Sequence, residues 1–303
     1  MRATPRERMY AVPNKVHVLD IGSVEDAGPS GEELIDELRQ RLASPSYQPP
    51  LLPAAALRLL DLTRKADVPF RAIREVLETE PMMTAAVLRL AQSPLYQRQE
   101  PIRTLEQAMS RLGTRTLADL FLQVSTTAKV FRAPGFDATM HALRRHSIAT
   151  AHVARLLCRY VPGFDEYAFM CGLLHDVGAA AGILALVDAR KGKPRSATAD
   201  AMVMRAVFEV HESCAEVLAK AWNLPGDVGL VLGHHHRLVI GGYVHPSAAS
   251  ICVADAVATE LGFGAGEEIR QDEVLRARRA LGLENGPYEV LKGAAAKLLA
   301  QIE

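Results

Sequence analysis

The chain has 303 residues, of which 49% are hydrophobic and 23% are charged, so it carries enough apolar surface for a sizeable core and extensive disorder is not expected. Its 35 Lys and Arg residues balance 35 Asp and Glu residues, and this neutral charge argues against a strongly basic nucleic-acid binder. The four cysteines form no CxxC pair, the N-terminus shows no apolar signal segment, and the longest apolar run (177–187) is too short to cross a bilayer. We therefore expect a cytoplasmic protein with reduced cysteines and neither a membrane nor a nucleic-acid partner.

The first 53 residues are expected to form a short segment that precedes the main domain. Residues 15–21 show period-two alternation and could form a short strand. An amphipathic helix is expected from Ser30 or Gly31 to Leu42, with acidic residues early and arginines late, as the helix dipole favours. Four prolines within 43–53 exclude regular structure there, so we interpret this segment as a linker.

Helical patterns continue almost without interruption from Pro53. An apolar stripe ends at Ser93-Pro94, which predicts the end of one helix. Thr104 and Gln107 have the spacing of a capping box, and Gly113 is placed to end the helix that they begin. Further helices are expected at residues 115–131, 137–160, 165–175, 201–222, 226–236, 246–261, 271–281 and 287–302. The predicted fold is therefore all-α, a multi-helix bundle with at most one short N-terminal β element.

One adjacent His-Asp pair stands in an apolar helical context. His175 and Asp176 follow the apolar run 169–174, where an unpaired buried charge would be costly. Neutral imidazole and carboxylate oxygen are ligands for divalent transition metals, so a bound ion would remove that cost. A helical bundle can bring together ligands from separate helices. The other candidate ligands are His146, His211, His234, His235 and Asp255.

The order of these residues resembles the metal-binding signature of the HD phosphohydrolase superfamily and, within it, of the HDOD family, the HD-related output domains of bacterial signalling proteins. Further landmarks of that family occur in the same order over about residues 49–260. They are Pro50–Pro53, Glu80-Pro81, Leu88–Ser93, Ile102 with Ala108, Leu112-Gly113, Gly172–Gly178, Trp222–Pro225 and His234-His235. Each piece is weak alone, but the ordered set is distinctive.

The resemblance implies a domain organisation. It places an N-terminal extension and linker at 1–48 and an HDOD domain at 49–260. That domain would have a helical N-terminal half (49–130) and an HD-like half (137–260). Residues 261–303 would form further helices packed on the domain.

The resemblance also implies metal ligands. In the superfamily the His-Asp pair, an upstream His and a downstream Asp hold one metal, and these map to His146, His175, Asp176 and Asp255. Additional histidines hold a second metal in the HD-GYP relatives, and these map to His211, His234 and His235. We therefore expect one or two divalent metal ions, with Fe, Mn, Zn and Mg as candidates.

Two departures from the active pattern bear on function. Catalytically competent relatives carry a lysine where this chain has Ala179, and a cation there would stabilise a transferring phosphoryl group. The HD-GYP loop is replaced by residues 236–243.

The resemblance therefore implies a regulatory module of bacterial signal transduction that acts by protein–protein interaction with a signalling partner, with no catalytic residue assigned. The alternative is a metal-dependent phosphohydrolase acting on a nucleotide or cyclic dinucleotide. Self-association is a further expected interaction.

Plainer interpretations stand beside these. His175 and Asp176 could form a hydrogen-bonded pair between helices with no ion, and His236 could be the exposed third histidine of its run. The single tryptophan, Trp222, is interpreted as a core anchor at a helix end. Residues 1–48 could instead dock a partner or a second copy of the chain.

Overall fold

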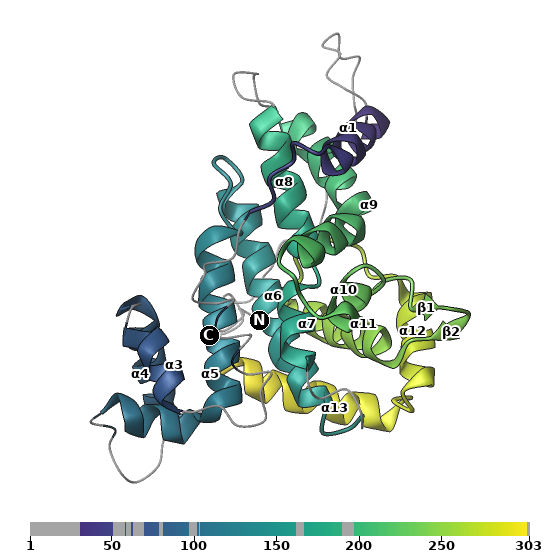
Figure 1. Cartoon of the computed structure of the whole chain (residues 1–303). Coiled ribbons are helices and arrows are strands. Elements are labelled where there is room, and N and C mark those ends of the chain that lie inside the picture. The colour runs from purple at the N-terminus through teal and green to yellow at the C-terminus, as the bar shows by residue number, and fades with distance from the viewer. Residues whose placement is uncertain are drawn as a thin grey trace, which may run out of the picture.

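The structure is a computed structural model, and it describes residues 31–50, 70–78, 81–96, 104–161, 167–189 and 197–301, together with Arg58, Leu62 and Ile102. Nearly all regular structure in these residues is helical (Figure 1). The elements are α1 (Gly31–Ala43), α3 (Phe70–Glu78), α4 (Pro81–Gln92), α5 (Leu105–Lys129), α6 (Asp137–Leu157), α7 (Ala168–Leu174), α8 (Val177–Ala189), α9 (Ala197–Ala221), α10 (Gly226–Leu232), β1 (Val239–Ile240), β2 (Tyr243–Val244), α11 (Pro246–Ala258), the π-helix η1 (Thr259–Phe263), α12 (Gln271–Ala280) and α13 (Gly286–Leu299).

The all-α prediction is confirmed. Within the described residues the strands are limited to the two-residue hairpin β1–β2, in which Val239 pairs with Val244. This hairpin was not predicted, because two-residue strands leave no alternating pattern to find. The predicted strand at 15–21 lies outside the described residues.

Local sequence signals set several helix ends. The Thr104 side chain accepts from the Gln107 backbone N–H while the Gln107 side chain accepts from Thr104, as the predicted capping box requires. Gly113 (φ +76°) interrupts α5, so the two helices predicted on either side of it meet there as one kinked element. The helix predicted from Gly31 is α1.

Helix α8 was not predicted. Together with α7 it forms an apolar span, Ala168–Val187, that is longer than the apolar run 177–187 noted in the sequence. By length and composition alone this span could cross a membrane. However, 78% of the most apolar part of this span is buried inside the protein, and the turn at His175-Asp176 divides it into α7 and α8. The span thus serves as the centre of the helical core.

The buried side chains form two cores. The main core takes residues from α1, from the end of α5 and from α6 to α13, whereas the second core is built by α3, α4 and the first part of α5. Figure 1 shows α3 and α4 on one side of the molecule, with α5 leading to the rest. The break between the cores falls between Phe121 and Leu122. The predicted domain boundaries at 48/49 and 260/261 stay predictions.

The segment 31–50 is tied to the main core. Leu34 and Leu38 of α1 are fully buried, and α1 packs against α8 and α9. Trp222, buried as predicted, donates its indole N–H to the Pro50 carbonyl (2.7 Å). The apolar face of α1 is therefore used within the chain.

Candidate metal centre

Two glycines let helices approach closely around His175-Asp176. A Cβ atom on Gly172 would lie 2.7 Å from the Ala151 Cα of α6, and one on Gly178 would lie 1.9 Å from the His211 carbonyl oxygen of α9. Only a residue without a side chain permits such contacts. The His-Asp pair, which these glycines flank, is thereby held between α6 and α9.

One group of donors gathers around His146 of α6. Its Nε2 lies 3.1 Å from the His175 Nε2 at the end of α7 and 3.2 Å from the Asp255 Oδ1 of α11. The Asp176 Oδ2 lies 3.3 Å from the His175 Nε2 and 3.5 Å from the His146 Nε2. We call His146, His175, Asp176 and Asp255 the first half-site.

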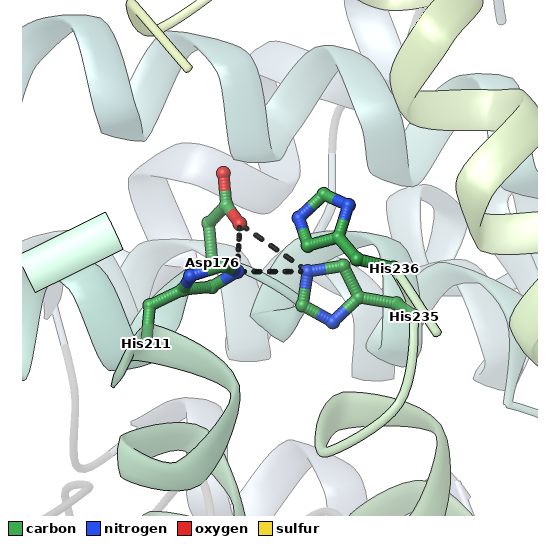
Figure 2. Close-up of side chains that lie close together, drawn as sticks. All are labelled: Asp176, His211, His235 and His236. Carbon is green, nitrogen blue, oxygen red and sulfur yellow. Dashed lines mark hydrogen bonds and ion pairs between the residues drawn. The ribbon is translucent and has the colours of Figure 1, made fainter. Parts of the chain in front are cut away.

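A second group lies on the other side of Asp176. The Nε2 atoms of His211 and His235 are 3.2 Å apart, and the Asp176 Oδ1 is 3.7 Å and 3.5 Å from them. His236 completes a cluster whose ligand atoms all lie within 4.8 Å of one another. Figure 2 shows the imidazoles of His211 and His235 meeting the Asp176 carboxylate, with His236 beside them. We call Asp176, His211, His235 and His236 the second half-site, so Asp176 offers one oxygen to each half-site.

Backbone hydrogen bonds fix which ring nitrogen faces the cluster. Each of three imidazoles places Nδ1 against the carbonyl three residues earlier, and Nδ1 is therefore the protonated nitrogen. The pairs are His175 with Gly172 (2.9 Å), His211 with Phe208 (2.6 Å) and His235 with Leu232 (2.9 Å). In the neutral rings each Nε2 then presents a lone pair inward.

The residues present fit a metal ion. Two Nε2 lone pairs facing each other at 3.2 Å repel unless a cation lies between them, and the Asp176 Oδ1 is buried without a hydrogen-bond partner. Histidine nitrogens oriented by carbonyls, with carboxylate oxygens between them, are what a transition-metal site requires. This buried cluster could thus hold divalent metal.

Charges inside the centre are strongly coupled. Burial opposes protonation of His175, but the adjoining Asp176 carboxylate outweighs burial and raises the pKa of His175 to about 9. Burial would raise the pKa of Asp176, yet His175 holds it well below its ordinary value. Burial also opposes ionisation of Asp255, but the hydrogen bond with His146 lowers its pKa to about 2. Without a metal, the first half-site therefore holds a proton in its place.

The second half-site behaves differently. Burial lowers the pKa of His211, His235 and His236, so these imidazoles are neutral near pH 7. Neutral imidazole is the form that binds a metal.

The structure brings six of the seven predicted ligands together and leaves His234 out. His234 follows the end of α10, and its Nδ1 donates to the Leu230 carbonyl (3.0 Å) instead. His236, interpreted above as the exposed member of the run, is only 7% exposed and points into the second half-site. The prediction that His236 is exposed is wrong, because the turn after α10 directs the second and third histidines inward.

Two glutamates beside the centre were not predicted. Glu212, next to His211, accepts from the His236 backbone N–H (3.0 Å) and pairs with Arg237 (2.9 Å), which fixes the turn that carries the histidines. Glu267 lies between η1 and α12, and its Oε1 is 3.2 Å from the His236 Nε2. Burial, reinforced by the Asp176 carboxylate, raises the pKa of Glu267 to about 7.

A pocket opens onto the centre, with about 400 Å³ of free space that includes open solvent. Its lining includes four members of the half-sites, namely His146, Asp176, His236 and Asp255. The remaining charged residues in the lining are Glu267, Glu268, Glu273 and Arg270. The pocket is therefore predominantly acidic. Ala179, at the position of the superfamily lysine, is fully buried in α8.

Comparison with known proteins places this site in a family. The HDOD domain family matches residues 50–238, which is more than half of the chain. The chain belongs to the HDOD family. Its match includes the His-Asp pair and all of the clustered histidines, whereas Asp255 and Glu267 lie beyond it. None of the curated proteins compared with the chain matches it.

Solved structures share the HDOD fold. A crystal structure from Shewanella amazonensis SB2B, named a putative metal-dependent phosphohydrolase, is 20% identical with a TM-score of 0.67, covering 90% of this chain and 99% of that one. An HDOD domain protein of unknown function from Geobacter sulfurreducens is 21% identical with a TM-score of 0.65, covering 89% and 96%. A putative signal transduction protein from Marinobacter aquaeolei VT8 is 21% identical with a TM-score of 0.66, covering 90% and 64%. These likenesses establish the fold.

Proposed function

We propose that this HDOD protein is a regulatory module of bacterial signal transduction that acts through protein–protein interaction, and that its HD centre binds divalent metal without hydrolysing phosphate esters. The observation that carries the proposal is the acidic pocket over the centre. Glu267, Glu268 and Glu273 line it, and among the described residues Arg270 is the one Lys or Arg in its lining. In the metal-free chain a phosphate ester entering this pocket would meet mainly like charge, whereas a metal cation would be attracted. With metal bound, the chain still offers no lysine at residue 179 to stabilise a transferring phosphoryl group.

The donor set favours particular metals. Each half-site combines imidazole nitrogen with carboxylate oxygen, a mixture that suits Fe, Mn or Zn better than Mg, which prefers oxygen ligands and retains water. Asp176 would serve both ions, His146, His175 and Asp255 the first, and His211, His235 and His236 the second.

Metal binding would link elements that are distant in the sequence. The ligands come from α6, the α7–α8 turn, α9, the segment after α10, and α11. An ion that binds one arrangement of these elements more tightly than another would shift the population of the whole domain. The centre would then act as a sensor, or as a structural metal site that stabilises a surface recognised by a signalling partner.

A metal-dependent phosphohydrolase is the second candidate. The observation in its favour is that the pocket reaches both half-sites, so a ligand entering it would meet His146, Asp176 and His236 together. One of the structural neighbours carries a phosphohydrolase name. Against this candidate, Ala179 supplies no charge, and a transferring phosphoryl group needs cationic stabilisation.

The first experiment compares wild type with Asp176→Asn. Metal content is measured by elemental mass spectrometry after reconstitution with Fe, Mn or Zn, and phosphate release is assayed with nucleotides and cyclic dinucleotides. We expect one or two equivalents of metal in the wild type, their loss in the variant, and equal background hydrolysis in both.

Each other outcome is informative. Hydrolysis that Asp176→Asn abolishes would overturn the regulatory proposal in favour of the enzyme. A wild type that takes up no metal after reconstitution would overturn the metal centre and leave a hydrogen-bonded His-Asp cluster.

A further inference from the structure

We infer that Glu267 is an additional ligand of the second half-site, so that this ion would be held by His211, His235, His236, Asp176 and Glu267. The inference rests on the proposed metal centre and adds a residue to it. Residue 267 lies outside the region 50–238 that matches the HDOD family, so this ligand would be a property of this chain's C-terminal segment.

The contact between Glu267 and His236 carries the inference. The His236 Nε2 lies 3.2 Å from the Glu267 Oε1, yet this buried nitrogen has no properly aligned hydrogen bond. Two donor atoms this close, without a proton aligned between them, are arranged as two ligands of one ion would be. His236 itself belongs to the cluster with Asp176, His211 and His235.

Arg270 lines the same pocket as Glu267 but forms no ion pair with it in the described residues. The Glu267 side chain is 20% exposed, and in the described part of the chain neither Lys nor Arg pairs with it. Asp176 and Asp255 line the same pocket. A mostly buried carboxylate beside two others is unfavourable unless a cation compensates them, and the proposed metal supplies that cation.

The backbone explains how residue 267 reaches the centre. Helix α11 ends in the π-turn η1, and Gly262 (φ +89°) and Gly266 (φ +97°) adopt conformations that other residues rarely take. The chain thereby turns back over the centre before α12 begins at Gln271. Helix α12 packs against α11, which carries Asp255, so both carboxylates are supplied by one local unit.

Glu267→Gln tests the inference on the full chain, with Glu268→Gln as the matched control. Both changes remove one negative charge from the pocket lining, but only Glu267 contacts the histidine cluster. Metal stoichiometry is measured by elemental mass spectrometry, and affinity by competition of Mn or Zn with a chromogenic chelator. We expect Glu267→Gln to lose one equivalent or to bind it at least about tenfold more weakly, because even groups that only support metal ligands contribute about 10–100-fold. Glu268→Gln should match the wild type.

A second variant separates a ligand from a general effect of charge. His236→Ala should affect the same equivalent, and combining it with Glu267→Gln should add little, since the two side chains would act on one ion. Unchanged stoichiometry and affinity in Glu267→Gln, with two equivalents in the wild type, would overturn this inference alone. A wild type without metal would overturn the proposed centre itself. Circular dichroism of each variant checks that it is folded.

Discussion

Asp176 is the residue that the two half-sites share. Its Oδ2 lies near His146 and His175, and its Oδ1 lies near His211 and His235. The carboxylate is almost fully buried, so its charge must be balanced by a neighbour. In the metal-free chain that neighbour is protonated His175, and in a loaded chain it would be metal.

Because metal would replace the proton on His175, the stability of the metal-free and metal-loaded proteins should depend differently on pH. The pKa of His175 is raised to about 9 in the folded chain, above its ordinary value of 6.5, so its stabilising effect is complete below about pH 6.5 and is lost as the pH rises through 9. Burial also raises the pKa of Glu267, and that of Asp119, which pairs with Arg155 in α6, to about 7. These two carboxyl groups lose their protons mainly at or below pH 7, so they change the stability little between pH 7 and pH 9. Chelator-treated protein should therefore melt at a lower temperature at pH 9 than at pH 7.

Metal-loaded protein should not show this decline, because ligation needs the unprotonated imidazole and a rising pH favours it. His175→Gln is the matched variant, and its chelator-treated form should show a flatter profile. Thermal melts at pH 7, 8 and 9, with and without chelator, measure both effects. A metal-free wild type whose melting temperature rises over this interval would contradict the assignment.

Residue identities at the centre were only partly predictable. The order of residues along the chain, read through the family resemblance, predicted six residues that the structure brings together. The choice among three adjacent histidines was not predictable, since it depends on where α10 ends and how the following turn is held by Glu212. Glu267 follows a π-turn in irregular chain, where no periodic pattern indicates which way a side chain points.

At the scale of elements, the crossing of α8 and α9 sets the second half-site. Gly178 is the second residue of α8 and lies two residues after Asp176, and its close approach to the His211 backbone holds the α7–α8 turn against α9. Any side chain at this position must push the helices apart.

Gly178→Ala should therefore destabilise the protein by about 3 kcal/mol, at the upper end of overpacking costs, since the new Cβ would meet backbone atoms. Gly182→Ala in the same helix is the control. There the nearest atom is the Val207 Cγ2 at 3.3 Å, and the gain in helix propensity, about 1 kcal/mol, offsets a mild contact. Urea denaturation followed by Trp222 fluorescence measures both. Equal stabilities would show that the crossing is not tightly constrained.

Helix boundaries were predictable where a local sequence signal marks them, and the prediction failed where no such signal is present. The capping box at Thr104 and the break at Gly113 are local signals, and both are present. Helix α8 escaped prediction because its residues 177–187 are apolar on every side and mostly buried, so they lack the polar face that reveals an amphipathic helix.

At the scale of the whole molecule, the candidate metal centre belongs to one core only. The residues proposed as its ligands lie on elements of the main core, whereas α3 and α4 belong to the second. Loss of metal should therefore loosen the molecule unevenly.

Hydrogen exchange followed by mass spectrometry can measure this unevenness. Adding chelator to loaded protein should speed amide exchange in peptides from α7, α8 and α11 by roughly tenfold or more, because bound metal stabilises only the conformation that holds it. Peptides from α3 and α4 should exchange as before. A uniform acceleration, or none, would contradict the placement of the metal in one core.

Helix α5 connects the two cores. It contributes Leu117 and Phe121 to the second core and Leu122 to the main core, and it also contacts α7, the helix that leads to His175. Beyond the kink at Gly113 the helix continues to Lys129. A change at the centre that tilted this helix near α7 would therefore move α3 and α4 relative to the main core.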